Sequence, residues 1–344
     1  MAFKFIKEKW FYLGLLILAL ILPLIITDRY IFQLVIMSII FAIATLSLNL
    51  ILGYTGQASL AHAGFFGIGA YGVGLLTTKL GLSFWLALPL ASLISAIIGF
   101  LIGLPTLRSR GSYFAIATLC FGVIITIVAG NWVDLTGGHT GLLGIPRPNP
   151  LTLPFAGKIE FESQTSHYYL VLFFLLLTLL VMHRLVFSLQ GLSFMAVRNN
   201  EPLAEAVGVN TFATKILSFV VANFFAGMAG GIYASLIGSI SPSTASVNLT
   251  FNWLTFLLLG GVATLAGPII GAFCIPILME YLQFLQEYRL IIFGALLIVV
   301  IIYFPRGLMG GIDSLRLWIK NSYTRRKAGG DKVVTPSGKS HQAV

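Results

Sequence analysis

Charged side chains are scarce in this 344-residue sequence: they make up 9% of it, whereas soluble domains average about 25%. Hydrophobic residues reach 58% of the chain, and the mean hydropathy is +0.96. A composition of this kind argues against a protein with a large soluble core. It predicts an all-α polytopic membrane protein built from long apolar helices.

Three further absences narrow the possible functions. The two cysteines, Cys120 and Cys274, each lie in an apolar stretch, which favours small core residues over a disulfide or a metal site. No GxxxxGK[S/T] phosphate loop occurs, so the chain does not hydrolyse ATP by that route, and we expect no cofactor in it. No carboxylate lies in the middle of a predicted span, because Asp134 and Glu280 lie near span ends. That absence disfavours proton-coupled carriers, which usually need such a buried acid.

Apolar segments follow one another along the chain and predict about ten transmembrane or re-entrant helical segments. A span needs about 20 apolar residues. The segment 251–265 is open to a re-entrant interpretation, and the number of crossings around 58–78 and 251–285 is open too. The expected segments are 11–27, 31–52, 58–78, 84–104, 113–131, 168–187, 215–238, 251–265, 268–285 and 290–304.

The distribution of basic residues predicts the orientation of the chain. With ten crossings and a cytoplasmic N-terminus, 16 of the 21 lysines and arginines fall on the cytoplasmic side, as the positive-inside rule requires. The net charge of +10 therefore reflects membrane topology and not nucleic-acid binding. We expect a cytoplasmic stub with the first helix at 1–30, a transmembrane domain at 31–312, and a disordered basic cytoplasmic tail at 313–344.

A polar insert lies between two long apolar segments and is predicted to contain a helix. It covers 191–210 and has the sequence GLSFMAVRNNEPLAEAVGVN. Asn200 is a favourable N-cap, and Gly208 can take the left-handed conformation that ends a helix. A helix this short is marginal in water, so we expect it to dock on a partner; a solvated loop is the alternative. Three residues share one face of this helix: Leu203, Ala206 and Val207.

Polar residues in or beside the spans are candidates for a substrate pathway, because an intramembrane polar group is costly without a function. His62 is the ionisable one; the alternative is a neutral histidine bonded to a neighbouring carbonyl. The others either meet a polar solute or tie helices together. The candidate residues are Asn49, Gln57, Ser59, His62 and Asn223.

Two further patterns each allow two interpretations. Small residues recur on one helical face at Ser59, Ala63, Gly67, Ala70 and Gly74. They either let helices approach closely or line a pathway. The segment 136–146, TGGHTGLLGIP, is either a half-helix that exposes its backbone to substrate or a structural turn.

Six blocks, taken together and in order, resemble the permease subunits of branched-chain amino-acid ABC transporters, the LivH/LivM type. The resemblance covers about 31–312, and two blocks, LRSRGSYFAIATL and TGGHTGLLGIP, are more similar to LivM. The blocks are LNLILGYTGQASLAHAGFFGIGAY (48–71), LRSRGSYFAIATL (107–119), LTGGHTGLLGIP (135–146), AVRNNEPLAEAVGVN (196–210), LLGGVATLAGPIIGA (258–272) and FPRGLMGG (304–311).

The resemblance implies an ABC importer permease fold in a bacterial inner membrane, transporting leucine, isoleucine and valine by alternating access. It implies a second homologous permease, two cytoplasmic subunits that bind ATP and magnesium, and a periplasmic or lipid-anchored substrate-binding protein. Related permeases carry urea, short amides or other amino acids. An ion-coupled secondary carrier or a membrane-embedded enzyme are the alternatives from other classes.

The resemblance also implies that 189–213 is the loop that couples the permease to its ATPases. Glu205, Ala206 and Gly208 stand in the places of the EAA-type pattern of importers. The strict pattern is not kept, since Pro202 follows Glu201. The residues implied in coupling are Arg198, Glu201, Leu203, Glu205, Ala206, Val207 and Gly208.

Overall fold

The computed structural model describes residues 19–24, 26, 28–109, 111–153, 157–159, 161, 163–288 and part of 291–310. Its longer α-helices are α2 (Arg29–Asn49), α3 (His62–Thr78), α4 (Phe84–Thr106), α5 (Ser112–Asn131), α7 (Gln164–Val186), α10 (Thr211–Ile237), α11 (Val247–Gly260) and α12 (Gly267–Tyr281). The shorter ones are α6 (Val133–Thr136), α8 (Leu189–Asn199) and α9 (Glu201–Ala206).

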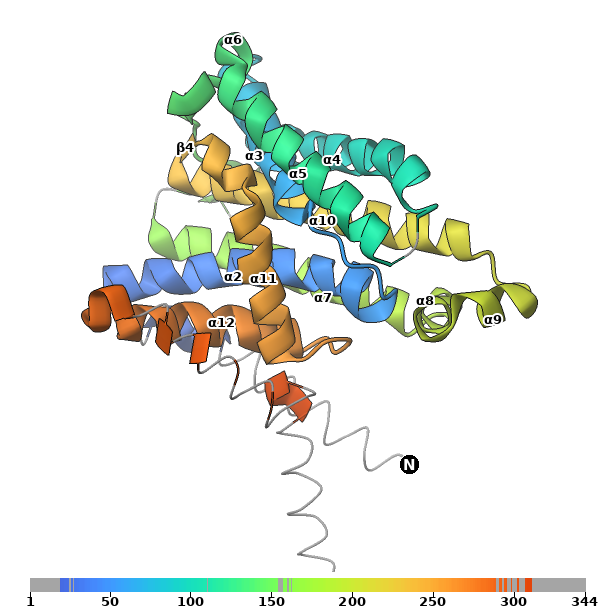
Figure 1. The fold of residues 1–344 in the computed structure, drawn as a ribbon. Helices are drawn as coiled ribbons and strands as arrows, with labels where there is room; N and C mark the ends of the chain where they lie inside the picture. Colours follow the sequence, from blue (N-terminus) through green and yellow to red (C-terminus); the bar gives the residue numbers. More distant parts are fainter. Residues whose placement is uncertain are drawn as a thin grey trace, which may run out of the picture.

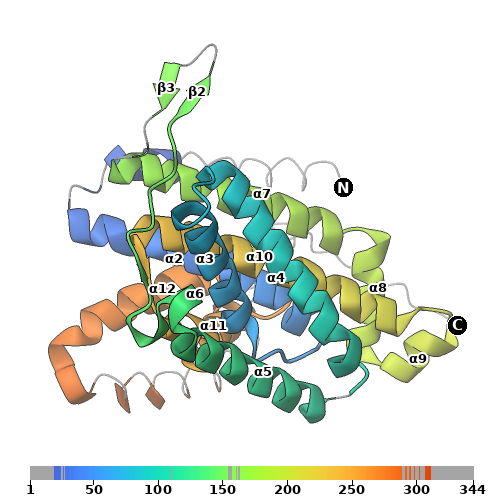
Figure 2. The same ribbon diagram turned by 90° about the horizontal axis from the view of Figure 1, so that it is seen from above.

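The remaining elements are short and lie at helix breaks. A π-helix, η1 (Leu50–Tyr54), continues α2, and 3₁₀-helices form η2 (Gly138–Thr140), η3 (Pro242–Ala245) and η4 (Leu282–Tyr288). Strand β1 (Leu142–Leu143) pairs antiparallel with β4 (Ser239–Ile240). Strands β2 (Leu151–Leu153) and β3 (Gly157–Ile159) form a hairpin that projects away from the helices (Figure 2).

Within the described residues, six helical segments are long and apolar enough to cross a membrane. They are Arg29–Tyr54, Phe84–Thr106, Ser112–Asn131, Gln164–Val186, Thr211–Ile237 and Gly267–Phe284, with Val247–Gly260 as a shorter apolar helix. The expected count of about ten is therefore not confirmed. The predicted spans 11–27 and 290–304 fall largely outside the described residues. The predicted segment 58–78 begins its helix only at His62, because residues 55–61 are irregular.

Helices α2 and α10 form the centre of the bundle. Helix α10 packs on α3, α4 and α2, while α2 also packs on α7 and α12. In Figure 1, α2, α7, α10 and α12 run side by side, α3, α4 and α5 lie obliquely across them, and α11 crosses α2 to reach α12. The most apolar window of α2 is 83% buried, against 28% for α5, so α5 lies at the periphery. The short helices α8 and α9 lie at one end of the bundle (Figure 1).

The close contact between α3 and α10 depends on glycines of both helices. A Cβ atom built on Gly69 would overlap the carbonyl of Gly227, and one on Gly230 would overlap the carbonyl of Phe66. Ser95 of α4 donates hydrogen bonds to the carbonyls of Asn223 and Phe65 and so joins all three helices. Because glycine has no Cβ atom, the two helix backbones can pack in direct contact. Such close packing holds helices together in a membrane, where lipid supplies no hydrophobic driving force between them.

The small-residue face of α3 is buried in the same way. A Cβ on Gly67 would overlap Ala245 of η3, and Ser59, Ala63 and Ala70 are fully buried. This supports the packing interpretation of the stripe, since its members contact other elements of the same chain.

We expect Gly230→Ala to destabilise the protein by about 1–3 kcal/mol, the usual cost of overpacking, because the backbone of α3 cannot move away without disturbing α4. The measurement is the thermal midpoint of unfolding in detergent. Gly122→Ala is the matched control: it adds the same methyl group to α5, where the nearest heavy atom would be 3.3 Å away. Equal midpoints for the two variants would contradict the proposed contact.

Candidate functional site

The polar insert folds as two helices, α8 and α9, and not as one. Helix α9 begins and ends as predicted: the Oδ1 atom of Asn200 accepts a hydrogen bond from the Leu203 amide at 3.1 Å, and Gly208 has a φ of 89°. Helix α8 begins at a second cap, where the Ser188 hydroxyl accepts from the Gln190 amide at 3.2 Å. The sequence analysis missed this cap because Ser188 lies before the polar residues that mark the insert.

The apolar face of α9 points away from the rest of the described chain. Leu203 is 62% exposed and Val207 is 71% exposed, and Ala206 between them is exposed as well. On the opposite side, Ala204 is buried. An exposed apolar face on a helix of six residues at the polar end of a membrane protein is typical of a protein-docking surface.

The two carboxylates of α9 point in the other direction and hold α9 to the first turn of α10. The Nζ atom of Lys215 lies 2.5 Å from Oε1 of Glu201, and the Thr211 hydroxyl donates to Oε1 of Glu205 at 2.7 Å. Lys215 is only 3% exposed. Glu201 and Glu205 thus contact their own chain, whereas the resemblance implied contacts with an ATPase. The analysis missed Lys215, although an isolated cation at the start of an apolar span is a detectable signal.

Helix α8 connects the insert to the end of α2. The side-chain stem of Arg198 packs on Gly56, where a Cβ atom would lie 3.0 Å from Cγ of Arg198. Gly56 has a φ of 77° and belongs to the irregular stretch that follows η1. A π-helix is rare and often marks a functional position. The contact joins the insert to the irregular stretch that directly follows this π-helix.

Asn49 binds the loop between α11 and α12. Its Nδ2 atom donates to the carbonyl of Thr264 at 2.7 Å, and its Oδ1 atom accepts from the amide of Ala263 at 2.9 Å. Gly53 leaves the space for this side chain, because a Cβ there would overlap the Asn49 amide. Asn49 therefore ties elements of the chain together, one of the two roles left open for the polar candidates.

His62 is fully buried at the start of α3. Its Nε2 atom lies 2.8 Å from the Ser47 hydroxyl oxygen and 3.2 Å from the Ala44 carbonyl oxygen, and its ring meets Trp253 edge-on. Since Ser47 donates its own proton to Ala44, a neutral ring with its proton on Nε2 satisfies this geometry. The arrangement matches the interpretation of a histidine bonded to a carbonyl.

The remaining pathway candidates do not converge on one site. Ser59 and Asn223 are fully buried, and their side-chain polar atoms have no hydrogen-bond partner among the described residues. The amide of Asn223 packs against Gly99. Gln57 is half-buried in the irregular stretch before α3. A pathway role for these five residues remains a prediction.

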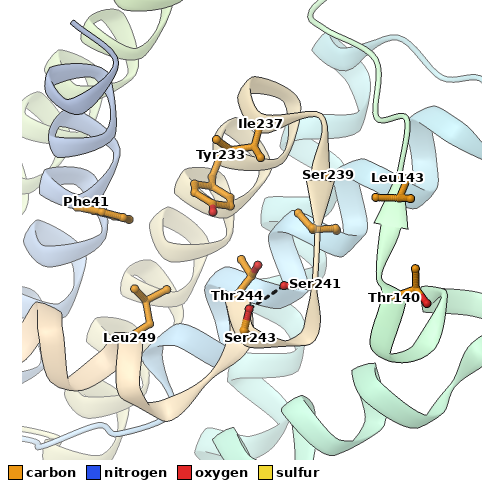
Figure 3. A pocket seen from close by; sticks show the side chains of 11 residues that line it. Phe41, Thr140, Leu143, Tyr233, Ile237, Ser239, Ser241, Ser243, Thr244 and Leu249 are labelled. Atoms are coloured by element: carbon orange, nitrogen blue, oxygen red, sulfur yellow. Dashed lines mark hydrogen bonds between the residues drawn. The ribbon is translucent and has the colours of Figure 1, made fainter. Parts of the chain in front are cut away.

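A cavity of about 290 Å³ opens at the β1–β4 end of the bundle, and none of the five candidates lines it (Figure 3). Apolar side chains and hydroxyl groups both line it, and none of the described residues around it is charged. The hydroxyls of Ser241 and Ser243 lie 2.7 Å apart at its wall. The lining residues are Phe41, Thr140, Leu143, Tyr233, Ile237, Ser239, Ile240, Ser241, Ser243, Thr244 and Leu249.

The loop 136–146 forms one wall of this cavity. Leu142 pairs with Ile240, and Gly137, Gly138 and Gly141 all have positive φ angles. The loop is therefore a specifically shaped turn, which is one of the two interpretations left open by the sequence. The sequence analysis missed the serines and threonine of 239–244, because hydroxyl residues beside a proline look like ordinary turn residues.

The six long apolar helical segments of the described residues are those of a multi-pass membrane protein. Residues 30–301 match the family described as branched-chain amino acid transport system, permease component, and the chain belongs to that family. The resemblance seen in the sequence is thereby confirmed.

The curated relatives include both LivM and LivH proteins. The chain is 33% identical to the high-affinity branched-chain amino acid transport system permease protein LivM of Salmonella typhimurium over 321 residues, covering 88% of this chain and 75% of the relative. For LivM of Escherichia coli K12 the identity is 32% with the same coverage. For LivH of Salmonella typhimurium it is 24%, covering 78% of this chain and 91% of the relative. No solved structure shows a significant match.

We expect Lys215→Met to loosen α9 from α10, because the variant removes the hydrogen-bonded ion pair with Glu201, which contributes about 1.5–3 kcal/mol. The measurement is hydrogen–deuterium exchange of 200–210, which should speed up at least tenfold. The double variant Glu201→Lys with Lys215→Glu should restore much of the protection. As a control, Lys79→Met removes a lysine that bonds the Asp134 carbonyl and should leave 200–210 unchanged. Unchanged exchange in Lys215→Met would contradict the role of the pair.

Proposed function

We propose that this chain is a permease subunit of an ATP-driven importer that carries leucine, isoleucine and valine across the bacterial inner membrane by alternating access. The observation that carries the proposal is the exposed apolar face of α9, fixed to the central helix α10 through Glu201 and Lys215. Family membership and the printed names of the relatives support the transport role.

The proposed complex contains a second, homologous permease, two cytoplasmic ATP-binding subunits, and a periplasmic or lipid-anchored substrate-binding protein. ATP and magnesium are bound by the partner subunits and not by this chain. The α8–α9 end faces the cytoplasm, as do both termini, with the stub at 1–30, the permease domain at 31–312 and the basic tail at 313–344. The occurrence of LivM and LivH proteins among the relatives supports the permease pair.

In the proposed cycle, ATP-driven closure of the ATPases moves the face formed by Leu203, Ala206 and Val207. Because α9 is bound to α10, and α8 to the break after α2, both central helices follow. Asn49 then transmits the movement of α2 to the loop between α11 and α12. Such coupling requires that the ATPases bind one conformation more tightly than the other.

The cavity supports a small neutral or zwitterionic substrate with an aliphatic part. Phe41, Ile237 and Leu249 offer apolar walls, while the serine and threonine hydroxyls can bond the polar end. The apolar walls favour a branched-chain amino acid over urea or a short amide. No carboxylate lies among the described residues of the lining, and this disfavours an ion-coupled secondary carrier.

We expect Leu203→Glu to weaken ATPase docking, because burying a leucine side chain contributes about 1.5–3 kcal/mol and a carboxylate cannot replace it. Leucine uptake by reconstituted vesicles should fall at least tenfold, and less ATPase should co-purify. Asn199→Glu is the control: it adds the same charge to an exposed residue of α8 outside the apolar face and should keep most activity. Normal uptake by Leu203→Glu would refute the docking role of α9.

A direct test of the whole proposal is to purify the tagged chain from its native membrane with its associated proteins. Two ATP-binding subunits and a similar permease should co-purify, and the complex should import leucine only with ATP. The proposal would be refuted if the chain purified without partners and an ion gradient alone drove its uptake of solute.

A further inference from the structure

Helix α11 exposes polar side chains within an otherwise apolar bundle. Asn248 and Asn252 are separated by one helical turn and both are exposed, and Thr255 follows on the same side. The opposite side, with Thr250, Trp253 and Leu257, is buried in the bundle where α11 contacts α2, α3 and α12. We call Asn248, Asn252 and Thr255 the amide face of α11.

Phe251 and Leu258 are exposed on the same side of α11, but the two amides of the amide face are unsuited to contact with lipid. Within the described part of the chain, neither side-chain amide has a hydrogen-bond partner, whereas the Thr255 hydroxyl is satisfied by the Phe251 carbonyl. An unpaired amide in hydrocarbon costs several kcal/mol. The amide face therefore requires water, solute or protein beside it.

Helix α4 shows what a lipid-facing surface looks like in the same protein. Its exposed side chains are apolar through the middle of the helix, as at Leu90, Leu93 and Ile97, while its serines, Ser92 and Ser95, point inward and bond carbonyls. The two helices thus distribute their polar residues in opposite ways. Of these two helices, only α11 directs side-chain amides outward that have no hydrogen-bond partner among the described residues.

The amide face begins beside the cavity, although none of its three residues lines it. Ser243 and Thr244 of η3 line the cavity and lead directly into α11, and Leu249, next to Asn248, forms part of the wall (Figure 3). From there α11 crosses the bundle to the loop that Asn49 holds at the end of α2 (Figure 1). A solute that leaves the cavity along α11 meets Asn248 first and Asn252 one turn later.

We propose that Asn248 and Asn252 bind the ammonium and carboxylate groups of an α-amino acid zwitterion on its way from the cavity through the membrane. An amide suits both groups, because its oxygen accepts hydrogen bonds and its nitrogen donates two. The two asparagines would thus bind the ammonium and carboxylate groups that all α-amino acids share. The side chain of the transported amino acid would contact the apolar walls. This inference rests on the proposed transport function and adds the residues of the route.

Cysteine accessibility tests the proposal in the complete, reconstituted transporter. Cys120 and Cys274, both exposed, are first replaced by serine, and Asn252→Cys is introduced. A charged, membrane-impermeant thiol reagent added on the binding-protein side should modify this cysteine. Leucine with the binding protein should slow the modification at least fivefold. Ile97→Cys, on the apolar face of α4, is the matched control and should not react.

Two results would overturn the proposal. Reaction with only an apolar maleimide, as for Ile97→Cys, would show that lipid covers the amide face. Cross-linking of Asn252→Cys to the second permease, without protection by leucine, would show that the face is a subunit interface.

Transport by side-chain variants gives a second readout. Asn252→Leu should reduce leucine uptake at least tenfold while the ATPases still co-purify, and Asn252→Gln, which keeps the amide, should recover a substantial part. Full uptake by Asn252→Leu would refute the proposal. Failure of the wild-type complex to import leucine would instead refute the proposed function, so the two hypotheses can be separated.

Discussion

Every helix that stops inside this apolar bundle must satisfy its free backbone groups within the chain, and the rest of the structure depends on how it does so. At the break before α3, the amides of Leu60 and Ala63 bond the hydroxyls of Thr118 and Thr250. At the break after α10, β4 pairs with β1, and the Ile145 amide bonds the Gly238 carbonyl. Between α11 and α12, Asn49 supplies the partners.

These satisfied breaks link distant parts of the chain. The two hydroxyl partners at the first break come from α5 and α11. The hydrogen bonds of Asn49 join residues more than 200 positions apart in sequence. The breaks thus act as junctions where helices are held to one another through backbone groups. Because a junction is specific in its geometry, a displaced helix carries its partner along. This is the physical basis on which movement of α8 and α9 can reach the opposite end of the bundle.

Local sequence signals predicted the elements that depend on local chemistry. The cap at Asn200 and the stop at Gly208 appear in the structure, because each depends on residues a few positions apart. The segment 251–285 is also divided into two helices, although α11 ends at Gly260 and not at the expected residue 265. The partner of Glu201 could not be found in this way. Lys215 lies beyond an irregular turn, so only the three-dimensional path of the chain brings the two charges together.

The residues of the candidate site were even harder to predict from local sequence signals. His62 and Asn49 were conspicuous because they are polar residues in apolar segments, yet the structure uses both to join elements. The cavity is lined by serines and threonines that are unremarkable in sequence, and it exists only because β1 and β4, about 100 residues apart, meet. A site assembled from backbone turns leaves little trace in residue type.

If the chain carries a zwitterion as proposed, the lining of the cavity has a kinetic consequence, because none of its described residues is charged. A zwitterion that meets only hydroxyls, amides and apolar walls is held without a strong counter-charge, so its dwell time is short and it leaves the site readily. Such a site does not become saturated in a way that slows turnover. Because the substrate is bound only weakly, binding alone cannot prevent it from returning to the side from which it came. In the proposed cycle, direction therefore comes from closing one end of the route before the other opens, and closure contributes more to one-way transport than the affinity of the cavity does.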